Sequence, residues 1–339
     1  MVAQGHAVTV FCRQSHAQAR PASLDGIDLR YLPALRGKHV ETISHTLLAA
    51  AAAARHDAVV CMGVGNAPVV RLLELAGHRT VFNVDGADWE RAKWGRGAAA
   101  YLRAAEVMAA HSRSIIVADA EVVRLHYLEK HHRETRLLAY GATPPADTGM
   151  AALQRLGVEP RAYALFVGRL EPENGADDFL AGVARSGVDL VPLVVGGVTY
   201  PGEYVDQLHT TAPSNAVFAG FQFGADYQQL TSHAALFVLA AKVGGTHPVL
   251  LEQMAAGNCI LARDTPANRE VLGDAGFYWD TPADLATRLA DLRDSPAEAA
   301  RLGAAARERQ RLRYDWDEVT AGYLELCAEA ASHRRRDAA

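Results

Sequence analysis

Short apolar runs alternate with helical patterns along the first part of the chain. Runs rich in β-branched residues predict strands at 7–11, 58–62, 80–84 and 114–119. The spacing of apolar positions predicts helices at 43–56, 67–77 and 99–111. Such alternation is typical of βαβ units, in which parallel strands form one sheet and helices cover its faces.

A loop rich in proline and glycine follows at 140–149, and the alternation then begins again. Here strands are expected at 163–168, 190–197, 216–220, 235–240 and 259–264, with helices at 176–187, 227–234, 248–257 and 283–295. The loop is therefore the candidate domain linker. The pattern predicts an α/β fold of two tandem doubly wound, Rossmann-like domains that face a central cleft, where ligands bind beyond the carboxyl ends of the strands.

The expected boundaries divide the chain into three parts. An amino-terminal domain is expected over 1–145 and a second domain over 146–312. The end of the chain, at 297–332, is amphipathic and helical. The last part, a helix and tail over 313–339, is expected to pack back on the amino-terminal domain.

The beginning of the chain departs from the usual order of a doubly wound domain. Gly5 and His6 have the character of a helix end that leads into the first strand, whereas such a domain normally opens with its central strand. We therefore expect a gap in the first sheet, with unpaired backbone beside it. Two explanations stay open: Met1 lies inside a longer protein, or the gene is truncated.

The stretch GGTHP, residues 244–248, connects a predicted strand to a predicted helix. Its two glycines allow unusual dihedral angles and a close approach of the backbone to a ligand. Thr246 or His247 can act as the N-cap, and the proline suits the first helical position. Gly257 suits the residue that ends the helix. A helix that begins in this way, with bare N–H groups, is a natural phosphate site.

One acid follows the GGTHP stretch. Glu252 lies four residues after Pro248, hence one turn into the helix and on the same side. This carboxylate lies too far into the helix to cap it, but it faces the helix N-terminus. There it can accept hydrogen bonds from the hydroxyl groups of a ligand. The alternative for this segment taken alone is a plain connection between strand and helix, with a glutamate that faces solvent.

A cation follows another strand of the same domain. Arg169 stands just past the predicted strand 163–168, where a guanidinium can neutralise a diphosphate. Taken alone it can equally be a surface arginine. The two loops thus bring together a helix N-terminus that suits a phosphate, an acid that suits hydroxyl groups, and a cation. Together these features indicate a nucleotide-sugar site.

Composition restricts the classes of function. The chain has 339 residues, of which 50% are hydrophobic and 22% charged, and its net charge is -5. These values are ordinary for a folded protein of two domains and lack the basic excess of a nucleic-acid-binding protein. Four separate cysteines form no C-x-x-C pair, and neither a signal peptide nor a long apolar run is visible. A cytoplasmic protein without nucleic-acid partners is therefore expected.

Several segments carry a family resemblance that extends over nearly the whole chain. They are GHAVTVFCR at 5–13, NVDGADWERAKWGR at 83–96, LFVGRLEPEN at 165–174, GGTHPVLLEQMAAGN at 244–258 and NREVLGDAGFYW at 268–279. With them the chain resembles the retaining glycosyltransferases of the GT-B fold, family 4. Within this family it is most similar to the rhamnosyltransferase-like enzymes of cell-surface polysaccharide biosynthesis.

The resemblance implies roles for the donor-side residues. Glu252 matches the second acid of the family's E-x7-E motif, which holds the donor ribose, while Gly244 stands where the first acid would be. The backbone of Gly245 and Thr246 would contact the donor phosphate or sugar. Arg169 matches the diphosphate-binding arginine. Asn174 replaces the lysine that the family has five residues later, which removes one cation from the donor site.

The resemblance also assigns the acceptor side. Asp85 would lie where the amino-terminal domain faces the transferred sugar, and its alternative is a turn residue in VDG. Trp89, Arg91, Lys93 and Trp94 follow on the same loop and would contact the acceptor by stacking or by pairing with a lipid phosphate. The alternative is a structural loop anchored by its tryptophans.

The implied activity is sugar transfer from a nucleoside-diphosphate donor to a glycan or lipid-linked acceptor, with retention of the anomeric configuration. L-rhamnose is the sugar that the subgroup suggests. Asp85, Arg169 and Glu252 are the predicted catalytic residues, and the departure of the diphosphate would be assisted by preorganised charge. Neither a cofactor nor a metal is expected, and the acceptor class implies peripheral contact with the inner face of a membrane.

Three other functions stay open. The segment GVGNAP at 63–68 follows a strand as in dinucleotide-binding oxidoreductases, but it lacks the third glycine. A nucleotide-sugar epimerase shares the two-domain fold but not the loop that begins at Asp85. A degenerate, non-catalytic GT-B protein that acts as a binding partner is favoured by Gly244, by Asn174 and by the missing first strand.

Overall fold

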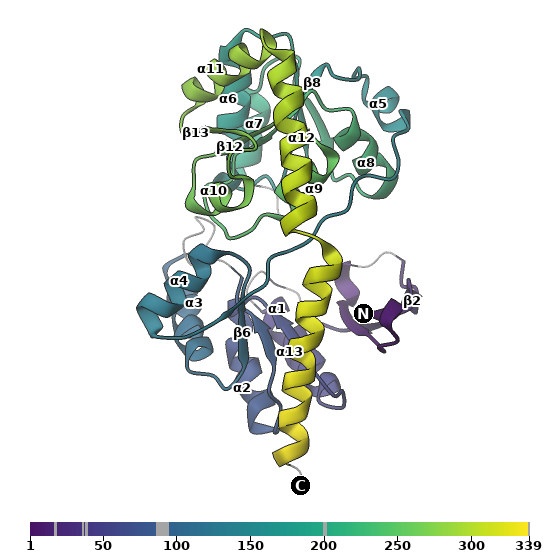
Figure 1. Cartoon of the computed structure of the whole chain (residues 1–339), viewed down its shortest axis with the longest axis vertical. Helices are drawn as coiled ribbons and strands as arrows, with labels where there is room; N and C mark the ends of the chain where they lie inside the picture. Colours follow the sequence, from purple (N-terminus) through teal and green to yellow (C-terminus); the bar gives the residue numbers. More distant parts are fainter. Residues whose placement is uncertain (17–18, 36, 38–39, 86–94, 199–201, 338–339) are drawn as a thin grey trace.

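The computed structural model describes residues 1–16, 19–35, 37, 40–85, 95–198 and 202–337. Two α/β domains lie one above the other in Figure 1, and two long helices at the end of the chain run along both of them. The described helices include none that is both long and apolar enough to cross a membrane.

The main sheet of the amino-terminal domain has four parallel strands in the order β4-β5-β6-β7. The strands are β4 (Val60–Met62), β5 (Val81–Asn83), β6 (Ile115–Ala118) and β7 (Arg136–Leu137). The helices that connect them are α2 (Ala67–Leu75), α3 (Arg96–Ala110) and α4 (Glu121–His131). Buried apolar side chains of β5, β6 and these helices form one core.

The first strands of the chain belong to a separate sheet. There β1 (Thr9–Arg13) runs parallel to β3 (Ile27–Leu32), and β2 (Ser23–Leu24) runs antiparallel to β3. The helix α1 (Glu41–Ala53) follows and packs on α2. The amino-terminal strands are therefore divided between two sheets, with β1 and β4 in different ones. The sequence pattern missed β2 and β3.

The second domain contains a six-stranded parallel sheet in the order β10-β9-β8-β11-β12-β13. Its strands are β8 (Tyr163–Val167), β9 (Val191–Val195), β10 (Val217–Gly220), β11 (Leu236–Leu239), β12 (Ile260–Arg263) and β13 (Phe277–Trp279). The chain leaves β8 in one direction for β9 and β10, and then returns to the other side of β8 with β11. The topological switch point, where ligands bind in doubly wound sheets, therefore lies between β8 and β11.

Helices cover both faces of this sheet, and two separate apolar cores result. They are α5 (Ala151–Leu156), α6 (Ala176–Ser186), α7 (Glu203–Thr211), α8 (Gly224–Ser232), α9 (Pro248–Ala256), α10 (Pro266–Leu272) and α11 (Pro282–Arg293). Because both faces of the sheet are buried, the sequences of its strands are continuous apolar runs. The loops after β8 and β11 lie side by side and share one pocket with Asp85 of the amino-terminal domain.

The end of the chain forms two helices where the sequence pattern predicts one helical stretch. They are α12 (Pro296–Arg313) and α13 (Trp316–Asp337). At the break, the Gln310 side chain donates hydrogen bonds to the carbonyl oxygens of Tyr314 and Ala142, at 2.8 Å each. Gln310 thereby ties the break to the linker between the domains. Beyond it, α13 packs Val319, Tyr323 and Leu326 against strands β5 and β6.

Candidate nucleotide-sugar site

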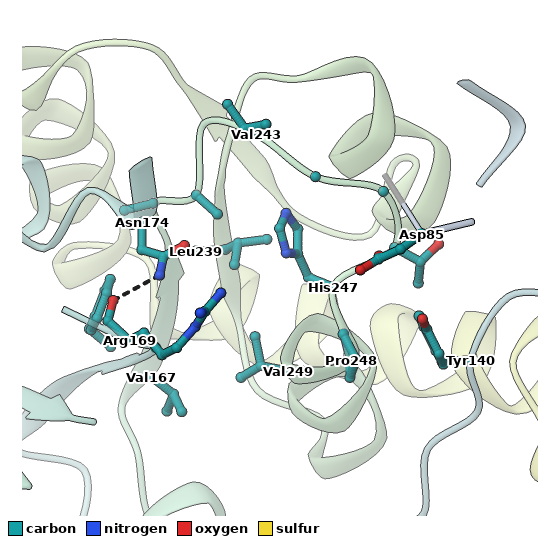
Figure 2. A pocket seen from close by; sticks show the side chains of 17 residues that line it. Asp85, Tyr140, Val167, Arg169, Asn174, Leu239, Val243, His247, Pro248 and Val249 are labelled. Carbon is teal, nitrogen blue, oxygen red and sulfur yellow. Dashed lines mark hydrogen bonds between the residues drawn. The ribbon is translucent and has the colours of Figure 1, made fainter. Parts of the chain in front are cut away.

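A pocket of about 290 Å³ opens at the switch point of the second domain, between the two domains. The ends of β8 and β11 and the start of α9 line most of it, while Asp85 and Tyr140 line it from the amino-terminal side. Figure 2 shows Arg169 and Asn174 on one side of the His247 ring and Asp85 and Tyr140 on the other. Besides Asp85, five other predicted site residues line this pocket: Arg169, Asn174, Gly244, Gly245 and Thr246.

Arg169 lies two residues after the end of β8, and its side chain is 46% exposed. Its guanidinium contacts the Glu171 carboxylate at 3.3 Å, a half-exposed pair that a ligand can replace. The Asn174 side chain donates a hydrogen bond to the Arg169 carbonyl oxygen at 2.8 Å (Figure 2). Asn174 therefore fixes the backbone that carries the cation, and its amide group adds no positive charge.

The helix α9 begins without a side-chain cap. His247 is the N-cap residue, and its side chain makes no capping hydrogen bond. Pro248 has no N–H group. The Leu250 N–H donates to the His247 carbonyl oxygen at 2.9 Å, which leaves the N–H of Val249 in the first turn.

Thr246, the other predicted cap, instead donates its hydroxyl hydrogen bond to the backbone carbonyl of Asp119, at 2.6 Å. Gly244 has a φ of 145°, and a Cβ atom there would lie 2.6 Å from Cε1 of His247. The helix ends as predicted, at Gly257 with a left-handed φ of 76°.

Glu252 does not line this pocket. It lies one turn into α9, half-buried, and its Oε2 accepts a hydrogen bond from the Tyr227 hydroxyl of α8 at 2.5 Å. Burial raises the pKa of Glu252, and the hydrogen bond from Tyr227 opposes that shift. The side chain therefore turns toward α8, and the role of Glu252 at the donor ribose stays a prediction.

Asp85 lies in a strained turn at the end of β5. Its φ is 59°, which is uncommon for a residue other than glycine. Its N–H donates to the Asn83 side chain at 2.8 Å, and the Asn83 amide donates to the Tyr323 hydroxyl of α13 at 2.9 Å. The last helix thus stabilises the turn that holds Asp85 in the pocket. Trp89, Arg91, Lys93 and Trp94 lie outside the described residues.

Asp119, which sequence reasoning missed, lies beside this pocket at the end of β6. Its side chain is fully buried. Burial and the nearby Asp85 charge raise the pKa of Asp119 to about 7. A signal for it existed, because it is an acid at the carboxyl end of the apolar run 114–119. Tyr140 and His247 were missed as pocket residues too: Tyr140 belongs to no motif, and His247 was considered only as an N-cap.

One group of possible metal ligands lies elsewhere in the amino-terminal domain. Oε1 of the buried Glu106 is 2.9 Å from Nε2 of His126 and 2.5 Å from Nε2 of His131. The Lys130 ammonium contacts the same oxygen at 3.1 Å. This carboxylate is therefore already neutralised within an ion-pair network between α3 and α4. The expectation that the protein needs no metal stays a prediction.

Two family descriptions match separate parts of the chain. Residues 161–295 match "Glycosyl transferases group 1". This matched segment covers most of the second domain. Residues 61–143 match a domain of unknown function, DUF1972. The loop of Arg169, the switch point and the start of α9 all lie within the matched glycosyl transferases group 1 segment.

Similar sequences include two characterised bacterial proteins. The chain is 28% identical over 200 residues to alpha-maltose-1-phosphate synthase of Mycobacterium tuberculosis, covering 54% of this chain and 51% of that protein. It is 30% identical over 214 residues to D-inositol 3-phosphate glycosyltransferase of Streptomyces avermitilis, covering 57% of this chain and 45% of that protein. The matches span about half the length of these relatives.

Similar solved structures extend over both domains. The Anabaena protein HepE in complex with UDP-glucose superposes with a TM-score of 0.75 and 18% identity, covering 90% of this chain and 86% of that one. Sucrose-phosphate synthase from Thermosynechococcus elongatus superposes with a TM-score of 0.78 and 17% identity, covering 97% and 90%. The fold is that of the GT-B glycosyltransferases, as the sequence predicted.

Proposed function

We propose that the protein is a glycosyltransferase that takes a sugar from a nucleoside-diphosphate donor and joins it to a glycan or lipid-linked acceptor. The observation that carries the proposal is the meeting of Arg169 and the uncapped start of α9 in one pocket at the switch point. Both features favour a diphosphate there, the first by charge and the second by the Val249 N–H group and the helix dipole. Asp85 faces them across the pocket (Figure 2).

In the proposed reaction, the bond between the anomeric carbon and the diphosphate oxygen breaks. A bond from an acceptor hydroxyl oxygen to that carbon forms on the same face, so that the configuration is retained. The hydroxyl proton passes to the departing diphosphate. Arg169 and the N–H group of Val249 stabilise the charge that develops on the leaving group, which is electrostatic catalysis by a preorganised site.

The family, the donor sugar and the acceptor are also part of the proposal. The resemblance of the motifs supports family 4, its rhamnosyltransferase-like subgroup and an L-rhamnose donor in cell-surface polysaccharide biosynthesis. A lipid-linked acceptor would bring the protein to the inner face of a membrane, with contact at its periphery. HepE was solved with UDP-glucose and with UDP, which supports a nucleoside-diphosphate sugar as the donor class.

A transfer assay tests this proposal. The protein is incubated with dTDP-L-rhamnose, UDP-glucose or GDP-mannose and a bacterial lipid extract, and the release of nucleoside diphosphate is followed. We expect release with one donor that depends on the extract. The coupling constant of the anomeric proton in the product, measured by NMR, should show the configuration of the donor; an inverted centre would contradict the retaining mechanism.

Two results would favour other functions. Conversion of a nucleotide sugar into its epimer without acceptor would indicate an epimerase. Tight binding of a nucleoside diphosphate with no turnover of any donor would favour a degenerate binding protein, in line with the loss of a cation at Asn174.

A further inference from the structure

The Asp119 carboxyl group is buried at the contact between the two domains. Asp119 ends the β6 segment of the amino-terminal domain, whereas its surroundings include the loop 244–246 of the second domain. Both carboxyl oxygens are fully buried, and no side chain among the described residues donates a hydrogen bond to them. The backbone N–H groups of Asp119 and Thr246 favour the charged form, but burial acts more strongly and favours the neutral acid.

Gly245 provides the space that the carboxyl group occupies. A Cβ atom on Gly245 would lie 2.8 Å from Oδ2 and 2.9 Å from Cγ of Asp119, and still closer to Oδ1. Gly245 does not have a positive φ, so its backbone conformation is open to alanine. Glycine is therefore required here by the contact with Asp119. The next residue, Thr246, donates a hydrogen bond from its hydroxyl group to the backbone carbonyl of Asp119. Gly245 and Thr246 therefore both contact Asp119.

The charged groups that act most on Asp119 are both acids. Asp85 follows β5 and Glu270 belongs to α10, and both disfavour a negative charge at Asp119. The phenol groups of Tyr140 in the linker and Tyr323 on α13 also lie near enough to interact with it. An ionised Asp119 would therefore face like charges, which the backbone N–H groups of Asp119 and Thr246 offset only in part.

We propose that Asp119 is a positioning residue whose neutral carboxyl group fixes the loop 244–246 of the donor-side domain against the amino-terminal domain. Ionisation of Asp119 would loosen this contact, so the placement of the loop at the pocket depends on pH. The consequence for donor binding rests on the proposed function, whereas the contact itself does not.

A double-mutant cycle tests the contact without any nucleotide. We expect Gly245→Ala to lower the melting temperature by about 4 °C or more, because the added methyl group overpacks the contact. In the Asp119→Ala background the methyl group has room, so the same substitution should cost less than about 1 °C. Equal costs in both backgrounds would overturn the proposed contact.

The pH dependence of unfolding tests the neutral form. An unfolded chain releases this proton near the ordinary pKa of about 4, while the folded protein keeps it to about 7. Between these values the folded state holds the extra proton, so stability falls as pH rises. The unfolding constant should increase by up to about tenfold per pH unit through this one group, and the dependence should end above pH 7.

Urea titrations at pH 5.5, 6.5 and 7.5 measure this contribution as the difference between the protein and Asp119→Asn, which cannot ionise. Thr80→Val is the matched control, since Thr80 is equally buried in the same domain but does not ionise. The control should keep the slope of the unchanged protein. An Asp119→Asn protein with the same slope would contradict the proposal, even if the transfer assay succeeds.

Discussion

Replacing Arg169 by alanine is expected to lower kcat/KM for sugar transfer by about two to three orders of magnitude. Removal of one preorganised charged donor from a developing anion has costs of this size. The structure gives a reason for a large effect here, because Asn174 holds the Arg169 backbone but contributes no second cation. The measurement is steady-state transfer with the donor that the protein uses.

A matched arginine on the same domain separates this effect from general loss of charge. Arg155 is also half-exposed and pairs with one acid, Asp226, at 2.9 Å. It lies outside the residues that line the pocket. Arg155→Ala should therefore leave kcat/KM within about twofold. Equal losses for the two variants would show that Arg169 has no special role in transfer.

Replacing Glu252 by alanine is expected to weaken binding of the nucleoside diphosphate by about 10- to 100-fold. This range corresponds to the loss of hydrogen bonds to a charged group, about 1.5–3 kcal/mol. The expectation depends on the family role of Glu252 at the donor ribose, since its carboxylate lies outside the pocket and contacts Tyr227. Isothermal titration calorimetry with the preferred nucleoside diphosphate measures the change.

Two companion variants decide whether Glu252 acts on the ligand or on α8. Glu252→Gln keeps an oxygen that can accept the hydrogen bond from Tyr227, but it lacks the negative charge. Tyr227→Phe removes the hydroxyl partner and leaves the carboxylate. If Glu252 binds ribose directly, Glu252→Gln should lose affinity and Tyr227→Phe should keep most of it. The opposite order would assign Glu252 a structural role between α8 and α9.

The sequence predicted the strands of the second domain better than those of the first, although it missed β13 and the helices α5, α7 and α10. Strands β8, β9, β11 and β12 are continuous apolar runs because both faces of the sheet are buried, and such runs are easy to recognise. By contrast, β3 (IDLRYL) alternates polar and apolar residues in a small, half-exposed sheet. Helix α4 was missed because its described side chains bury only Val123 and Tyr127. A helix that buries few side chains has few apolar positions, so its spacing pattern in the sequence is weak.

Some residues of the candidate site could also be predicted from the sequence, whereas others could not. Arg169 and the glycines before α9 could be predicted, since a local motif at the carboxyl end of a strand determines where they lie. The direction of the Glu252 side chain could not, because it depends on Tyr227 in another helix. Asp119 meets Gly245 only across the two domains, a contact between residues more than one hundred positions apart. Local spacing carries no information about such a pair.

A thermal-shift titration measures whether the pocket at Arg169 binds the diphosphate of a nucleotide sugar. The ligands are dTDP, UDP, GDP and NAD, and the proteins are the unchanged chain, Arg169→Ala and Arg155→Ala. A ligand that binds only the folded state raises its melting temperature. We expect a shift with one nucleoside diphosphate that Arg169→Ala loses and Arg155→Ala keeps. Cooperative melting without a shift for all three nucleoside diphosphates, or a shift with NAD alone, would contradict this expectation.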